Sequence, residues 1–93
     1  MKIYVLENSW VILAEEVQEA DHHYNVNHAY VVRRWGTNAG IGQLAREGIR
    51  ENTILDAQPA TRIPKSAITF IIDCEDFITP EYITSKLVDS KIK

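Results

Sequence analysis

The most informative stretch of the chain reads Val31-Val32-Arg33-Arg34-Trp35-Gly36-Thr37-Asn38-Ala39-Gly40-Ile41-Gly42-Gln43-Leu44-Ala45-Arg46-Glu47-Gly48, and it contains all four glycines of the protein. This pattern predicts a strand that ends in two arginines and a tryptophan, then a glycine-rich turn, then a short helix. Ile41, Leu44 and Ala45 recur at helical spacing, and Gly48 stands where such a helix would stop. We expect the apolar face of this helix to pack against a sheet.

The overall composition is that of one small globular domain. Of the 93 residues, 45% are hydrophobic and 25% are charged, as in ordinary globular proteins. A chain of this length is too short to form two separate cores. Because a domain of this size buries a limited share of its surface, we expect it to assemble as a homo-oligomer. The net charge of −3 argues against nucleic acid as a partner, since general nucleic-acid binders are basic.

Cysteine content and hydropathy indicate the compartment. The single cysteine, Cys74, cannot form an internal disulfide, and we expect it to be a small buried hydrophobe at a strand end. No apolar run reaches the about 18 residues that a membrane span requires, and the N-terminus lacks the pattern of a signal peptide. The sequence therefore predicts a cytoplasmic protein that does not enter a membrane.

The strands are expected where β-branched and aromatic residues cluster between turn signals. They are predicted at residues 2–6, 10–17, 29–35 and 66–73, with the second and fourth buried on both faces. Residues 49–60 are expected to be mostly irregular, and prolines limit residues 59–64 to a short edge strand at most. Thr79-Pro80-Glu81 predicts the start of a C-terminal helix. The fold class is thus α+β: a small antiparallel sheet of about four strands, a short helix after the third strand and a C-terminal helix.

The polar residues 18–28 contain all three histidines of the chain and predict an exposed loop or an extended hairpin tip. Imidazole and carboxylate groups are natural zinc ligands, so one interpretation of this segment is a metal site at His22, His23 and His28. The adjacent His22 and His23 cannot easily turn to one ion, and no cysteine supports them. We therefore expect a solvated segment and no metal.

The spacing of the glycines matches two nucleotide-binding motifs, each of them only in part. Gly40-x-Gly42-x-x-Ala45 matches the dinucleotide fingerprint formally, but the chain is too short for the repeated strand–helix–strand units of that fold. The Walker pattern fails as well, because no lysine follows Gly42. A dinucleotide or mononucleoside-triphosphate fold is therefore not expected.

The chemistry beneath those motifs still predicts a local ligand site. Unpaired N–H groups at the start of a helix attract anions, arginines bind them in a bidentate manner, and a tryptophan can stack on a base. A small nucleotide-like or anionic ligand would then contact Arg33, Arg34, Trp35, Thr37, Asn38, Gly40, Gly42 and Gln43. In the alternative, Trp35 is part of the core, one arginine pairs with a glutamate, and the glycines only shape a tight turn.

No catalytic motif is present in the sequence. The serines lack a nucleophile elbow, and no histidine is placed beside a nucleophile. The carboxylates Glu15-Glu16 and Asp73-x-Glu75-Asp76 are typical of solvated rims, although the second group could attract a basic partner surface. We expect a protein that is not an enzyme and that uses no cofactor.

The segment Arg33-Arg34-Trp35-Gly36-Thr37-Asn38-x-Gly40-Ile41-Gly42-Gln43-Leu44-Ala45-x-x-Gly48 resembles a family of small phage and prophage proteins of unknown function. The strand that leads to Cys74 is also similar. The resemblance implies a viral origin, action in the host cytoplasm and no particular chemistry. Since small phage proteins often act on host machinery, the first hypothesis is an interaction protein that inhibits a host (defence) factor. The second is a sponge that sequesters a nucleotide-like signal at the Arg33–Gln43 turn.

Overall fold

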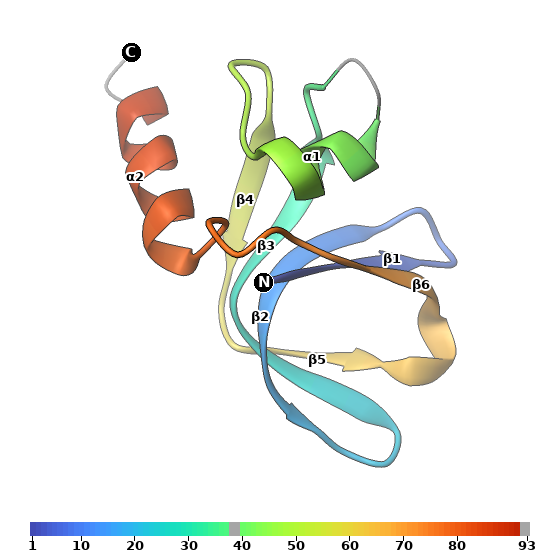
Figure 1. The fold of residues 1–93 in the computed structure, drawn as a ribbon. Helices are drawn as coiled ribbons and strands as arrows, with labels where there is room; N and C mark the ends of the chain where they lie inside the picture. The colour runs from blue at the N-terminus through green and yellow to red at the C-terminus, as the bar shows by residue number, and fades with distance from the viewer. Residues whose placement is uncertain (38–39, 92–93) are drawn as a thin grey trace.

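The computed structural model describes residues 1–37 and 40–91, which form an antiparallel sheet with two α-helices beside it (Figure 1). In chain order the elements are β1 (Lys2–Leu6), β2 (Val11–Glu19), β3 (His23–Arg34), α1 (Ile41–Glu47), β4 (Ile54–Gln58), β5 (Thr61–Pro64), the 3-10 turn η1 (Lys65–Ala67), β6 (Ile68–Asp73) and α2 (Pro80–Lys91).

The sheet is organised around β3, which is twelve residues long and pairs with three other strands. The strand order is β4-β3-β2-β1-β6, and every neighbouring pair is antiparallel. The first part of β3 pairs with β5, where Tyr24 lies opposite Ile63. The second part pairs with β4, where Val32 lies opposite Leu55. A long β3 therefore connects two ends of the molecule, and α1 lies at only one of them (Figure 1).

The core consists of two clusters, one on each side of the sheet. Ile3 and Leu13 pack with Leu44 and Ala45 of α1 and with Ile83 of α2. The second cluster lies on the opposite side and contains Tyr4, Ile12, Ala14, Val26, Ala29 and Ile63. Because successive strand residues point to opposite faces, β1 contributes one fully buried residue to each cluster.

The α+β class and the antiparallel sheet are confirmed, but the number of strands is wrong. The described residues contain six strands rather than about four. Residues 49–53 and 59–60 are irregular as predicted, but the residues between them form β4, whose Leu55 is buried against β3. The short edge strand between the two prolines is present as β5. The two strands beyond the predicted four, β4 and β5, are short. Their own sequences favour strand formation only weakly, and pairing with β3 stabilises them.

Of the two forms predicted for residues 18–28, an exposed loop or an extended hairpin tip, the structure has the hairpin tip. β2 continues to Glu19, and β3 begins at His23. Polar residues mark its exposed positions, while Val26 is buried in the second cluster. The bulge near His28, which has a φ of +48°, disturbs the two-residue alternation that would have identified this strand.

Strands β2 and β6 differ in burial, although the sequence predicted both to be buried on both faces. In β2, residues Val11 to Ala14 are buried, as a strand between two neighbours should be. In β6, Phe70 is 49% exposed and Thr69 is also exposed. The prediction for β6 fails because this strand pairs only with β1 and lies at the end of the sheet.

The helices were placed approximately by the sequence. Helix α1 buries Leu44 and Ala45, and the N–H of Gly48 donates to the carbonyl of Leu44 at 2.9 Å where the helix ends. Helix α2 begins at Pro80, and the hydroxyl of Thr79 accepts a hydrogen bond from the N–H of Tyr82 at 3.1 Å. In the described residues, neither helix is long and apolar enough to cross a membrane.

Candidate ligand site at the end of β3

The end of β3 lies against the residues that precede β4, and Gly36 makes this approach possible. Gly36 has a φ of +70°, and a Cβ at this position would lie 2.4 Å from the backbone nitrogen of Thr53. Any other residue would both strain the backbone and collide with it. The hydroxyl of Thr53 then donates to the carbonyl oxygen of Trp35 at 2.7 Å. The chain thus turns sharply after β3 and places Asn52 beside the strand end.

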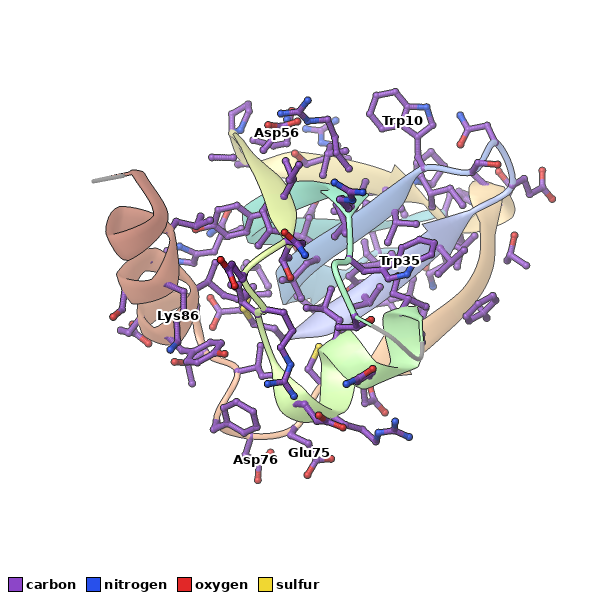
Figure 2. The ribbon with its side chains drawn as sticks, turned by 90° about the horizontal axis from the view of Figure 1, so that it is seen from above. Trp10, Trp35, Asp56, Glu75, Asp76 and Lys86 are labelled. Carbon is purple, nitrogen blue, oxygen red and sulfur yellow. The ribbon has the colours of Figure 1, made fainter. Side chains whose placement is uncertain are left out.

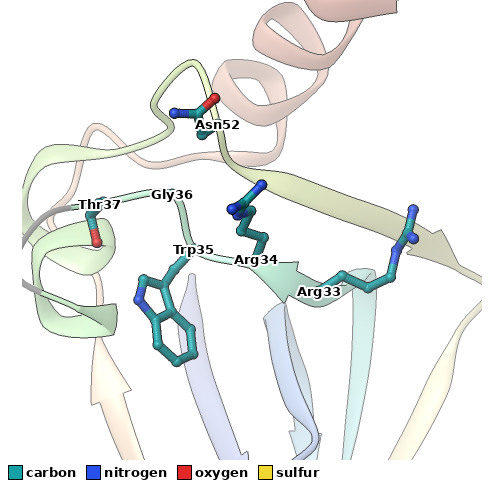
Figure 3. A pocket seen from close by; sticks show the side chains of 6 residues that line it. All are labelled: Arg33, Arg34, Trp35, Gly36, Thr37 and Asn52. Atoms are coloured by element: carbon teal, nitrogen blue, oxygen red, sulfur yellow. The ribbon is translucent and has the colours of Figure 1, made fainter.

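A hollow of about 420 Å³ lies at this strand end, and Figure 3 shows the residues around it. Its lining residues are Arg33, Arg34, Trp35, Gly36, Thr37 and Asn52. In Figure 3 the side chain of Arg34 rises toward Asn52, whereas Arg33 points toward β4 and the indole of Trp35 points away from Asn52. The hollow therefore offers a polar side with a cation and an amide, and a separate aromatic side.

The two arginines differ in their pairing. Arg33 and Asp56 form a bidentate pair, with 2.5 Å between Nε and Oδ2 and 3.1 Å between Nη2 and Oδ1. Arg34 has no ion-pair or hydrogen-bond partner for its guanidinium among residues 1–37 and 40–91. Both side chains are exposed. Arg34 is consequently the arginine whose charge is available to a ligand.

The alternative in which this segment is only structural is partly wrong. Trp35 is 41% exposed and does not belong to either core cluster. One arginine does pair with an acid, but the acid is Asp56 rather than a glutamate. Gly36 does shape a tight turn, as that alternative held.

A second hollow of about 370 Å³ adjoins the first and shares Gly36, Thr37 and Asn52 with it. Its other lining residues are Gln43, Arg50 and Glu51. The guanidinium of Arg50 pairs with the carboxylate of Glu47, to which the side-chain amide of Gln43 also donates at 3.2 Å. The hydrogen bond from Gln43 and, less strongly, the contact with Arg50 lower the pKa of Glu47. Because Glu47 neutralises Arg50, the carboxylate of Glu51 gives the second hollow a negative charge.

The structure brings together only part of the predicted site. Arg33, Arg34, Trp35 and Thr37 line the first hollow and Gln43 lines the second, but Gly40 and Gly42 line neither. Asn38 lies outside the described residues. The turn separates the start of α1 from the strand end, and the hydroxyl of Thr37 is engaged with the carbonyl oxygen of Gly40.

The sequence missed four lining residues of the two hollows, namely Gly36, Arg50, Glu51 and Asn52. Asn52 and Thr53 lie in a turn, in which the Thr53 hydroxyl accepts a hydrogen bond from the N–H of Arg50 at 2.9 Å. What places Asn52 at the hollow is the pairing of β4 with β3. A strand prediction for β4 was the one signal that could have brought this turn to the end of β3.

The other candidate groups are dispersed over the surface. His28 lies 3.9 Å from Glu15 but His22 and His23 lie at the far end of the hairpin, and no group of three metal-ligating residues occurs in the described part of the chain. Glu16 accepts hydrogen bonds from Lys2 at 3.3 Å and from the buried Tyr4 hydroxyl at 3.5 Å. Glu16 therefore has a structural contact, and burial together with its charge raises the pKa of Tyr4.

Comparison with models of known protein families gives no match, and comparison with curated protein sequences gives none either. The resemblance to small phage proteins consequently rests on the residues quoted for it and stays a prediction. Function is therefore inferred from the geometry at the end of β3.

Proposed function

We propose that this protein is a non-enzymatic binding protein that holds a small aromatic anion, such as a nucleotide-like signal, at the end of β3. The observation that carries this proposal is the unpaired, exposed Arg34 in a hollow that it shares with Trp35 and Asn52. A cation, an amide and an indole are the groups that recognise an anionic group, a polar edge and an aromatic ring.

The charges around the hollow favour a ligand with few negative charges. Arg33 and Arg50 are each neutralised by an acid, and Glu51 lines the adjoining hollow. Arg34 alone supplies a net positive charge near Asn52. A monophosphate or a carboxylate matches this balance better than a polyphosphate, whose remaining charges would stay uncompensated.

The surface around the end of β3 also supports a second candidate function, the binding of a host protein. Trp10 is 52% exposed and lines a further hollow of about 270 Å³ together with Arg33. Tryptophan and arginine are enriched at the energetic centres of protein interfaces. Two exposed indoles around two arginines would suit an inhibitor of a host factor, the role that a phage origin suggests.

Thermal unfolding with a panel of ligands tests the first proposal. A ligand that binds only the folded protein at 100 times its Kd should stabilise it by about 2.7 kcal/mol. The panel should contain nucleoside monophosphates, the matching triphosphates and inorganic phosphate, and we expect the monophosphates to raise the melting temperature most. If no compound in the panel changes the melting temperature, the proposal of a nucleotide-like ligand is wrong.

Arginine variants locate the site. Arg34→Ala should abolish the ligand-induced shift while the far-UV circular dichroism stays unchanged, because Arg34 makes no internal pair. Arg62→Ala is the matched control, since Arg62 is an exposed arginine on β5, which pairs with the first part of β3, away from the hollow. If the Arg33→Ala/Arg34→Ala double variant fails to fold, these arginines are structural. A wild-type pull-down from host lysate that yields a stable partner lost in Trp10→Ala would favour the protein-binding candidate.

A further inference from the structure

Strand β6 has an open edge, and this edge differs from the others in the sheet. It pairs with β1 on one side, and no described strand pairs with it on the other. An unpaired edge presents a row of backbone donors and acceptors to any strand that approaches. Beyond the strand, the N–H of Glu75 donates to the carbonyl of Ala45 in α1 at 2.9 Å, so the free edge ends at Asp73. Up to that residue, the edge of β6 is a surface to which a further strand can add.

The hydrogen bonds of β1 show which groups of β6 point outward. The N–H of Cys74 donates to the carbonyl of Met1 at 3.1 Å, so this pair is a hydrogen-bonded one. Bonded and non-bonded pairs alternate along an antiparallel ladder. The backbone N–H and C=O groups of Ile72 and Phe70 therefore point toward β1, while those of Ile71 and Asp73 point away from it. A register shift beside Thr69 interrupts the ladder at the start of this regular edge.

The other free edges carry a charge and a proline, whereas β6 has no proline and its single charge, Asp73, is its last residue. The edge strand β4 contains Asp56 and is followed by Pro59, while β5 contains Arg62 and ends at Pro64. Charges and prolines on an edge prevent the addition of strands. Residues 66–72 of β6 and the preceding turn contain no charge and no proline, and Phe70 is 49% exposed. A solvent-exposed apolar edge of this kind favours association.

We propose that β6 pairs with β6 of a second copy of this chain, in antiparallel orientation about a two-fold axis at Ile71. This register joins the outward backbone groups of Ile71 to those of Ile71 in the other copy. It places Phe70 opposite Ile72 of the second copy, an aromatic and β-branched pair that stabilises neighbouring strands. It also places Asp73 opposite Thr69 of the second copy, where a hydroxyl can donate to the carboxylate.

Charge favours the antiparallel arrangement of two copies. In the proposed register the two Asp73 residues lie four positions apart, about 13 Å at 3.3 Å per residue. A parallel arrangement would bring the same two carboxylates together and would oppose association. The two-fold pair is closed, so the association ends at a dimer. This dimer uses neither of the hollows at the end of β3, and its failure would leave the proposed function intact.

Sedimentation equilibrium of the full chain over a range of concentrations tests the proposal. We expect a dimer for the wild type, and we expect Phe70→Lys to raise the dissociation constant at least tenfold because it places a charge at the interface. Asp73→Pro removes an outward N–H without removing a bond to β1, and it should weaken the dimer as well. Ala57→Lys is the matched control, since Ala57 is exposed on the β4 edge, and its dimer should be unchanged.

Circular dichroism of each variant confirms that it is folded. A monomeric wild type, or an assembly larger than a dimer, would overturn the proposal. So would a dimer that survives both β6 variants, or one that Ala57→Lys dissociates. Because Phe70→Lys leaves Arg34 and Trp35 untouched, it should keep any ligand-induced change in melting temperature, which separates this test from that of the ligand site.

Discussion

The hydroxyl oxygen of Tyr82 in α2 accepts a hydrogen bond from the backbone N–H of Ile49 at 3.0 Å. This contact joins the C-terminal helix to the segment after α1, which continues to Asn52 at the hollow. Gly48 leaves room for the phenol, since a Cβ there would lie 2.2 Å from the hydroxyl oxygen. The position of Asn52 therefore depends in part on α2, a helix that does not itself line the hollow.

Tyr82→Phe should lower the free energy of unfolding by about 1 kcal/mol, because it leaves the N–H of Ile49 without its partner. Urea unfolding measures this loss. Tyr24→Phe is the matched control, since the Tyr24 hydroxyl makes no hydrogen bond within the described residues, and its stability should stay near that of the wild type. Equal stabilities for both variants would show that the Tyr82 hydroxyl does not stabilise the fold.

Gly48→Ala should be more destabilising than Gly40→Ala. Both glycines have similar backbone angles, with φ of +87° and ψ of −167° at Gly48 and φ of +82° and ψ of −162° at Gly40. The strain that this backbone imposes on alanine, about 1–3 kcal/mol, is thus common to both. Only at Gly48 does the new methyl group also collide with Tyr82, whereas nothing lies within 4 Å at Gly40. Chemical denaturation of the two variants measures the difference, and equal losses would contradict the close packing of α2.

Gly42→Ala should stabilise the protein by roughly 0.5–1 kcal/mol, because Gly42 is inside α1 and alanine restricts the unfolded chain. A Cβ at this position meets no atom within 4 Å. Since Gly42 lines neither hollow at the end of β3, the variant should also keep the ligand-induced shift. Thermal melts with and without ligand check both results. Loss of binding would return Gly42 to the site that the sequence predicted.

Asp56→Asn should change stability by less than about 1 kcal/mol, since the pair with Arg33 is exposed to solvent. It should at the same time free the charge of Arg33 at the hollow. We therefore expect tighter binding of the anionic ligand and a steeper dependence of affinity on salt. Isothermal titration at two salt concentrations measures both. Unchanged affinity would mean that Arg33 does not reach the ligand.

The thiol of Cys74 should react slowly in the folded protein. Burial, with a smaller contribution from Asp73, raises its pKa to about 11, although the N-terminal amino group acts in the opposite direction. At pH 8 the reactive thiolate is then scarcer than in the unfolded chain, and alkylation should be at least about tenfold slower. The rate in the folded protein should rise as the pH approaches 11. Iodoacetamide labelling followed by mass spectrometry checks this, with urea-unfolded protein as the reference.

The sequence predicted two kinds of element correctly. One kind has a start signal in its own sequence, and the other is buried on both faces along a run of residues. Residues 11–14 of β2 are apolar on both faces, which predicts a buried strand, and these four residues are buried. Helix α2 begins at Pro80 because Thr79 and the proline are a local start signal. The strand-to-helix order around Gly36 followed from the glycines in the same way.

Long-range pairing accounts for the elements that the sequence missed. Nothing local distinguishes β4 from a loop, and its Leu55 is buried only because β3 lies beside it. Asn52 reaches the hollow as a consequence of that pairing, so the candidate site could be predicted only on its β3 side. For β6 the apolar pattern was correct as a strand, but the pattern cannot tell a central strand from an edge on which Phe70 stays exposed.

The division of β3 between β5 and β4 has a practical consequence. The turn between β2 and β3, where the N–H of Ala20 donates to the carbonyl of His23 at 2.9 Å, lies at the opposite end of the molecule from α1 (Figure 1). Asp21 and His22 are exposed there, and Trp10 is exposed elsewhere on the surface (Figure 2). A fluorophore or an affinity tag attached at this turn would therefore lie far from the hollow and leave it open, although both adjoin the strand that carries Arg34.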